Sequence, residues 1–204
     1  IQRNNPSFIM QRTRHLDLGC GPVPRNPYQQ DELFGVDIAP TENSSQITIR
    51  QANLTLQPIP FPDHYFDSLS AFDFLEHVPR VLPTPDGLST RFPFIELMNE
   101  IHRVLRPGGI LYALTPCYPA YEAFQDPTHV NIMTEKTHLY FTGANPLGRM
   151  YGFSGQFEAR KVEWVVHKDA LTPLVPLNLS QKFRRMNYKL KGKFTHIAWE
   201  FIAK

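Results

Sequence analysis

The sequence has few cysteines, little net charge and no long apolar run, and each absence excludes a class of protein. Two cysteines, Cys20 and Cys117, cannot form a disulfide framework and favour a reducing, cytoplasmic compartment. A net charge of +2 gives no reason on its own to expect nucleic-acid binding. No apolar run approaches the length of a membrane span. The prediction is a cytoplasmic globular protein.

Proline, in contrast, is abundant. The 204 residues include 19 prolines, which favours ordered loops over long helices. The length fits one domain, predicted to cover residues 1–204. One long helix is predicted at about 94–105, where apolar residues recur at i, i+3 and i+4 until Arg106-Pro107-Gly108-Gly109. Strands are predicted at about 14–18, 33–38, 46–50, 67–72, 110–114, 156–166 and 194–203, a short helix at 134–142, and a basic connection at 182–193.

The most informative stretch is His15-Leu16-Asp17-Leu18-Gly19-Cys20-Gly21, an apolar run that ends in an acid and two glycines. A second run, Leu33-Phe34-Gly35-Val36-Asp37, also ends in an acid. A strand, a glycine turn and a carboxylate at the tip of the next strand are how an open α/β sheet holds a nucleoside. Pro24 replaces the third glycine of the NAD fingerprint, and no helix N-terminus follows to hold a pyrophosphate. The pattern therefore disfavours a dinucleotide.

The connections after the first two predicted strands are too short or too rich in proline for a full helix. Pro22, Pro24 and Pro27 interrupt the first connection, and residues 39–45 form a short polar second one. An α/β sheet normally has helices on both faces. We therefore expect a second copy of the chain or a partner subunit to cover the face that lacks them.

With these features in place, the chain resembles the class I S-adenosylmethionine-dependent methyltransferases, in particular those of type 11. The resemblance follows the family order through His15–Gly21, Gly35–Ile38, Ala52–Leu54, Pro60–Asp63, Phe66–Asp67, Phe74–Val78 and Glu100–Gly109. It implies an α/β, Rossmann-like fold with a seven-stranded, mostly parallel sheet and an antiparallel last strand. The helices after strands one and two are expected to be reduced or absent.

The resemblance also implies an activity: transfer of a methyl group from S-adenosyl-L-methionine to an oxygen or nitrogen acceptor, leaving S-adenosyl-L-homocysteine. The expected acceptor is a small molecule or a glycan intermediate. The cofactor-binding residues carried over from the family motifs are Asp17, Gly19, Cys20, Gly21, Asp37, Ile38, Asn53, Leu54 and Phe72. Asp17 would brace the loop and the amino-acid end of the cofactor. Asp37 would accept hydrogen bonds from both ribose hydroxyls, and Asn53 would contact adenine. The alternatives are a tight structural turn, a strand-end cap at Asp37, and an Asn53 that bonds its own backbone.

His129, in a polar loop after the fifth strand, is the candidate general base. Its alternative role is to pin that loop through Asp126. Glu76 and His77 match a family motif that is structural as often as catalytic. Cys117 lacks the partner motif of the RNA cytosine methyltransferases, and Cys117, His129 and His138 have no recognisable metal-ligand spacing, so no metal is predicted.

The basic segment 182–193 leaves other functions open. Its cations alternate with aromatic residues, as in surfaces that hold an anionic acceptor or RNA, although a solvated basic loop is also consistent with them. The enzyme alternative is an RNA or protein methyltransferase that uses this segment. The non-enzyme alternative is a scaffold subunit that keeps the fold without the catalysis.

Overall fold

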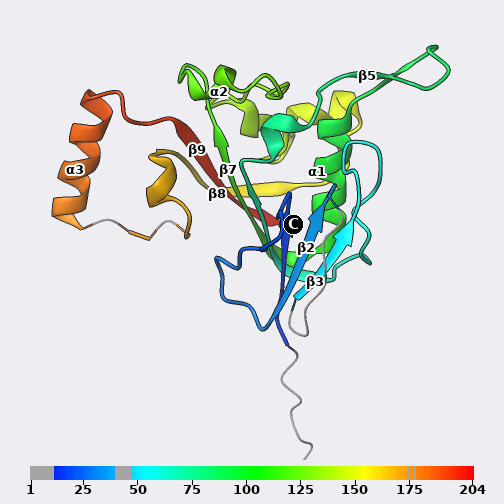
Figure 1. Ribbon diagram of the computed structural model, residues 1–204, viewed down its shortest axis with the longest axis horizontal. Coiled ribbons are helices and arrows are strands. Elements are labelled where there is room, and N and C mark those ends of the chain that lie inside the picture. Colours follow the sequence, from blue (N-terminus) through cyan, green and yellow to red (C-terminus); the bar gives the residue numbers. More distant parts are fainter. Residues whose placement is uncertain (1–11, 40–46, 174, 177) are drawn as a thin grey trace, which may run out of the picture.

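A seven-stranded sheet organises the computed structural model, which describes residues 12–39, 47–173, 175–176 and 178–204 (Figure 1). In sheet order the strands are β3 (Ile47–Gln51), β2 (Glu32–Asp37), β1 (Arg14–Leu18), β4 (Phe66–Phe72), β7 (Leu105–Pro116), β9 (His196–Ala203) and β8 (Phe157–Val165). All pairs are parallel except the two that β9 makes with β7 and β8. The predicted fold class is therefore confirmed.

Most of the remaining elements are short, as the proline content predicted. The helix predicted at 94–105 is α1 (Pro93–Val104), and α2 (Glu122–Gln125) is a single turn. The described residues also form four 3-10 helices in the connections between strands: η1 (Leu75–His77), η2 (Thr137–Tyr140), η3 (Leu147–Tyr151) and η4 (His167–Asp169). A small hairpin joins β5 (Leu82–Pro83) to β6 (Thr90–Arg91). The short helix expected at 134–142 is thus only the 3-10 turn η2.

The two faces of the sheet differ in chemistry because apolar and polar residues alternate along its central strands. Leu16 and Leu18 of β1 and Leu69 of β4 join the core cluster that also includes the buried residues of α1. On the other face, β1 and β4 present buried polar side chains: His15, Asp17, Ser68 and Ser70. One face is therefore a conventional apolar core, and the other combines these hydrogen-bonded side chains with a second, smaller apolar cluster that includes Phe72 and Tyr112.

A loop covers part of the polar face where an α/β sheet usually has a helix. The connection between β1 and β2 contains no helix, as predicted. Its Tyr28 ring meets Tyr112 edge-on at 6.3 Å, and the Tyr28 hydroxyl donates to Glu200 at 3.3 Å. The guanidinium of Arg25 lies 4.7 Å above the ring of Phe72. In the second connection, residues 40–46 lie outside the described residues.

The segment predicted as a basic connection is instead a helix, α3 (Leu179–Leu190). A capping box begins it: the Asn178 side chain accepts from the Gln181 backbone, and the Gln181 side chain accepts from the Asn178 backbone. The cationic residues suggested a loop, but apolar residues recur along this segment at helical spacing, and they are exposed: Leu179, Phe183, Met186 and Leu190. Figure 1 shows α3 at one side of the molecule, away from α1. No helix within the described parts of the chain has the length and apolar content needed to cross a bilayer.

Gly35 of β2 lets the first connection pack against the sheet. A Cβ at this position would lie 2.5 Å from Cys20 Sγ and 2.8 Å from Pro24 Cγ. We expect Gly35→Ala to destabilise the protein by about 1–3 kcal/mol, the usual result of overpacking a rigid site. Urea unfolding measures this effect. Cys20→Ala should restore part of the loss in the double variant; a purely additive double variant would contradict the contact.

Candidate functional site

The glycine turn after β1 has the backbone conformation that only glycine adopts readily. Gly19 and Gly21 have φ angles of +63° and +57°. A Cβ on Gly19 would lie 2.5 Å from the Phe74 ring, whereas a Cβ on Gly21 would meet nothing within 4 Å. Gly19 is therefore required by packing, and Gly21 leaves open space beside the backbone. Such an opening suits a ligand that approaches the main chain closely.

Asp37 joins this turn to the end of β2. Its Oδ2 accepts a hydrogen bond from the Gly21 N–H at 2.8 Å, and its Oδ1 accepts one from the Ala39 N–H at 2.8 Å. Each carboxylate oxygen has a second lone pair, so the group can accept from a ligand as well. The neighbouring Ile38 side chain is 64% exposed, which places an apolar surface beside the carboxylate. The carboxylate can accept hydrogen bonds from ribose hydroxyls, and the apolar surface beside it can contact a nucleobase. This combination suits a nucleoside.

Asp17 lies beneath the turn in a buried network. Its Oδ2 accepts from the Arg25 N–H at 2.8 Å, and its Oδ1 accepts from the Ser70 hydroxyl at 2.6 Å. Because Ser70 donates to Asp17, it accepts from Nε2 of His15 at 2.8 Å, which leaves Nδ1 of His15 to accept from Ser68 at 2.7 Å. Burial raises the pKa of Asp17 to about 6 and lowers the pKa of His15 to about 3. Asp17 thus braces the first connection from below.

The other residues predicted to bind the cofactor differ in how far they are buried and in which groups they contact. The Asn53 side chain accepts from the Thr55 N–H at 3.1 Å, the local bond anticipated as its alternative role. Leu54 is buried in the core. Phe72 is buried against Tyr112, with ring centroids 5.8 Å apart, on the polar face of the sheet. Cys20 is half-buried, and burial raises the pKa of its thiol to about 12. Their roles in cofactor binding stay predictions.

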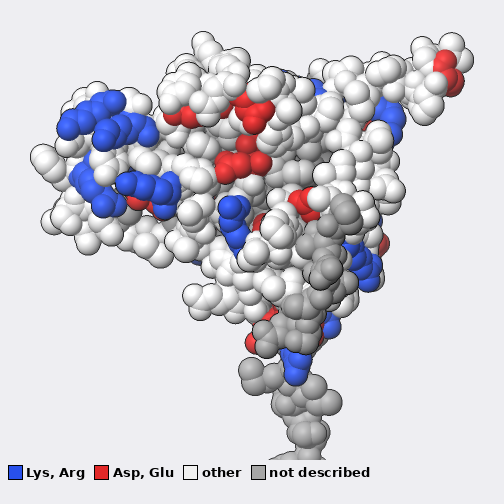
Figure 2. All heavy atoms as spheres, in the orientation of Figure 1, with Lys and Arg blue, Asp and Glu red and all other residues white. Residues whose placement is uncertain are grey.

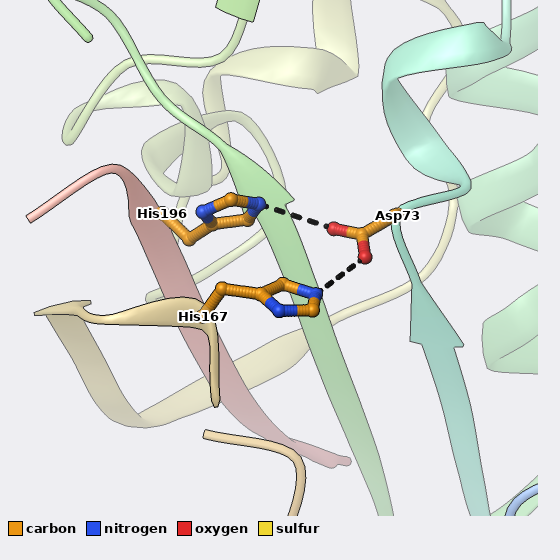
Figure 3. Close-up of side chains that lie close together, drawn as sticks. All are labelled: Asp73, His167 and His196. Atoms are coloured by element: carbon orange, nitrogen blue, oxygen red, sulfur yellow. Dashed lines mark hydrogen bonds and ion pairs between the residues drawn. The ribbon is translucent and has the colours of Figure 1, made fainter. Parts of the chain in front are cut away.

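Two histidines that the sequence analysis did not single out converge on Asp73 (Figure 3). Asp73 follows β4 with a left-handed φ of +48°. Nε2 of His167, in η4, donates to its Oδ2 at 2.7 Å, and Nε2 of His196, at the start of β9, lies 3.3 Å from its Oδ1. Burial alone would raise the pKa of Asp73, but the bonds and charges of the two imidazoles outweigh it and lower the pKa. Their positions in the sequence could have indicated this convergence, because both histidines lie near the ends of predicted strands that meet at one edge of the sheet.

His167 has the arrangement of an oriented base. Because its Nε2 donates to Asp73, Nδ1 carries the lone pair, and Nδ1 makes no hydrogen bond within the described residues. The His167 side chain is 40% exposed. His129 differs, since its side chain is 9% exposed and its Nε2 lies 4.0 Å from Asp126 Oδ2. Of the two, His167 is the one that a dissolved acceptor can reach.

A mainly apolar cavity of about 400 Å³ lies between the α1 N-terminus, η2 and η3. Phe92, Phe94, Tyr140 and Tyr151 are among its walls, together with the cations Arg80 and Lys136. Arg80 donates to the Asn131 side chain, in the loop after β7. The volume is in the range of small-molecule sites.

Comparison with known proteins relates part of this chain to a known family. Residues 16–113 match the family model described as a methyltransferase domain. A curated relative named "Probable methyltransferase ltbC", from Aspergillus luteorubrus, is 29% identical over 125 residues. That match covers 51% of this chain and 40% of the relative, so the chain spans less than half of the relative's length.

Solved structures of this fold resemble nearly the whole chain. A chain of the complex between the Haloferax volcanii Trm112 methyltransferase activator and a methyltransferase has a TM-score of 0.58, with 12% identity over 95% of this chain and 83% of that one. An S-adenosylmethionine-dependent methyltransferase from Mesorhizobium loti has a TM-score of 0.53, with 14% identity over 95% and 91% of the two chains. The [4+2]-cyclase SpnF has a TM-score of 0.53, with 19% identity over 94% and 74%. These likenesses establish the fold and leave the reaction to the site.

Proposed function

We propose that this chain, a member of the class I methyltransferases, binds S-adenosylmethionine against the Gly19–Gly21 turn and Asp37. The observation that carries the proposal is the pairing of an open glycine turn with a carboxylate that already holds it. The ribose hydroxyls would donate to Asp37, and the base would rest on Ile38. Asp17 supports the turn from beneath rather than from the surface, since it is buried and its two oxygens accept bonds from Arg25 and Ser70.

The reaction we propose is methylation of an oxygen or nitrogen nucleophile. S-Adenosylmethionine, when bound, supplies a methyl group on a positively charged sulfur. Alignment of the acceptor with that methyl group can supply most of the catalysis. His167 would accept the acceptor's proton at Nδ1, while Asp73 holds the ring through its hydrogen bond to Nε2. His129, the base expected from the sequence, has no such orientation and far less exposure.

A small molecule is the acceptor class we favour. The aromatic cavity beside the loop after β7 has the size for one, and Arg80 and Lys136 would favour an acidic group on it. The alternative acceptor is RNA, supported by the exposed cations of α3 and the residues after it (Figure 2). They are Lys182, Arg184, Lys189, Lys191 and Lys193.

Calorimetry with S-adenosylmethionine and S-adenosylhomocysteine tests the cofactor, and methyl-labelled S-adenosylmethionine tests the acceptor. The labelled cofactor would be incubated with fractionated small molecules and, separately, with RNA, at low and high salt. We expect binding of both cofactor forms and label in a small-molecule fraction. Absence of cofactor binding would refute the proposal and favour a scaffold, whereas label found only in RNA would refute the acceptor class.

His167→Gln should lower kcat about 10- to 100-fold against the acceptor that the labelling identifies. This loss in kcat is at or below the usual contribution of a general base, because alignment of the acceptor with the methyl group supplies most of the rate enhancement. S-Adenosylmethionine affinity should change less than about twofold. Steady-state kinetics over pH measure the effect, with His138→Ala as the control for a histidine away from Asp73. Equal kcat values for His167→Gln and the wild type would show that His167 is not the general base.

A further inference from the structure

A second cluster of metal-binding side chains lies on the same edge of the sheet as Asp73. Glu76 and His77 come from η1, directly after β4, and His129 comes from the loop after α2. One carboxylate oxygen of Glu76 and one ring nitrogen of each histidine lie within 4.8 Å of one another. The two imidazole rings meet edge-on with centroids 4.9 Å apart. Small side-chain rotations would bring all three atoms to the ligand distance of about 2.0–2.2 Å from one ion.

Two atoms of this cluster are buried without a hydrogen-bond partner among the described residues. They are Oε1 of Glu76 and Nδ1 of His129. Glu76 is 2% exposed and the His129 side chain 9% exposed, so water does not readily satisfy either atom. A buried polar atom left unpaired usually destabilises a protein by about 1–3 kcal/mol, and such atoms are rare. Two of them in one cluster of ligand-type side chains indicate a missing shared partner.

The other atoms of the same side chains are held by neighbours. The Thr115 hydroxyl donates to Oε2 of Glu76 at 3.0 Å. The Thr128 hydroxyl donates to Asp126 at 2.6 Å and therefore accepts from Nδ1 of His77 at 2.9 Å. That bond fixes the His77 tautomer with the lone pair on Nε2. Outer partners of this kind orient the ligands of protein metal sites.

The backbone fixes the two segments relative to each other. The N–H groups of Val130 and Asn131 both donate to the Glu76 carbonyl oxygen, each at 2.9 Å. The Asn131 side chain donates to the Leu75 carbonyl oxygen at 3.1 Å. The ligands are therefore positioned before any ion arrives, as a metal site requires. The Asp73 cluster is different, because its carboxylate and His167 already bond each other directly.

We propose that Glu76, His77 and His129 bind one divalent transition-metal ion, with Zn²⁺ as the representative. Two imidazoles and one carboxylate are ligands that Zn²⁺ accepts, and three protein ligands leave a fourth position for water or another oxygen ligand. Oε1 of Glu76, Nε2 of His77 and Nδ1 of His129 are the assigned ligand atoms. The site is independent of the proposed methyl transfer, since it rests on other residues and can bind an ion without cofactor.

The test measures Zn²⁺ bound by the full chain after removal of metals with a chelator and dialysis. We expect the wild type to bind one equivalent of Zn²⁺ in calorimetry. Bound Co²⁺ should show the visible absorption bands that are typical of a low-symmetry coordination site. Glu76→Gln and His129→Ala should each weaken Zn²⁺ binding at least 100-fold. Thr128→Ala, which removes an outer partner, should weaken it about 10-fold. Circular dichroism checks that each variant folds.

Matched controls decide between this cluster and other histidines. His138→Ala and His167→Ala should both retain one equivalent of Zn²⁺. Loss of binding in His167→Ala with retention in Glu76→Gln would overturn the proposal in favour of the Asp73 cluster, and a wild type that binds no Zn²⁺ or Co²⁺ would overturn it outright. If His129→Ala does not fold, His77→Ala serves in its place, because the His77 ring is partly exposed.

Discussion

Replacing Asp37 with alanine is expected to weaken S-adenosylmethionine binding about 100-fold or more. Two hydrogen bonds from ribose hydroxyls to a carboxylate contribute about 1.5–3 kcal/mol each, and both are lost. The variant also removes the acceptor that holds the Gly21 N–H, so the turn itself should loosen. Asp37→Asn keeps an acceptor for that N–H and removes the charge, so we expect a smaller loss of about 10-fold. Calorimetry measures both.

A ribose contact and a merely structural role for Asp37 can be separated with simpler ligands. If Asp37 accepts from the ribose, the wild type should prefer adenosine to 2′-deoxyadenosine, and Asp37→Ala should lose that preference. If Asp37 only holds the turn, both ligands should weaken together. Asp86→Ala, an acid in the β5–β6 hairpin, is the control and should bind like the wild type. A preference that survives in Asp37→Ala would contradict the assignment.

The order of motifs predicted the sheet because hydrophobic pattern and strand-end chemistry are local features of a sequence. The alternation in His15-Leu16-Asp17-Leu18 and in Ser68-Leu69-Ser70 also shows in retrospect that part of one face of the sheet is polar. That face needs hydrogen-bond partners more than it needs a helix. Tyr28 and Arg25 of the first connection supply part of its cover, although the sequence alone suggested a partner subunit.

Long-range convergence is what the sequence did not reveal. Asp73 and His167 are 94 residues apart, and their contact depends on η4 lying at the edge where β8 and β9 meet. A residue count cannot predict such a contact, because the loop from β8 into η4 decides where the ring points. The same holds for Glu76 and His129, which the backbone bonds of Val130 and Asn131 bring together. Helix α3, in contrast, has local signals in the sequence, namely its capping box and the helical spacing of Leu179, Phe183 and Met186, although its cations favoured a loop.

The buried pair His15 and Asp17 should give opposite pH dependences of stability. The pKa of His15 falls from 6.5 to about 3 on folding, so the unfolded chain binds the extra proton and stability falls as the pH drops below 6.5. The pKa of Asp17 rises from 3.8 to about 6, so the folded chain binds the extra proton and stability rises as the pH drops below 6. Between pH 7 and pH 5 these amount to about 2 kcal/mol of stability lost through His15 and about 1 kcal/mol gained through Asp17.

Single variants should expose the two opposing contributions. Relative to the wild type, Asp17→Asn should lose about 1 kcal/mol of additional stability between pH 7 and pH 5, because only the His15 contribution remains. His15→Gln should instead gain about 2 kcal/mol over the same interval. Urea unfolding at the two pH values measures both differences, and groups common to all the proteins cancel in the comparison. Ser68→Ala, which removes a non-titrating partner of His15, should shift stability equally at both pH values. Variants that change with pH in the same direction would show that the two side chains do not titrate as the buried network requires.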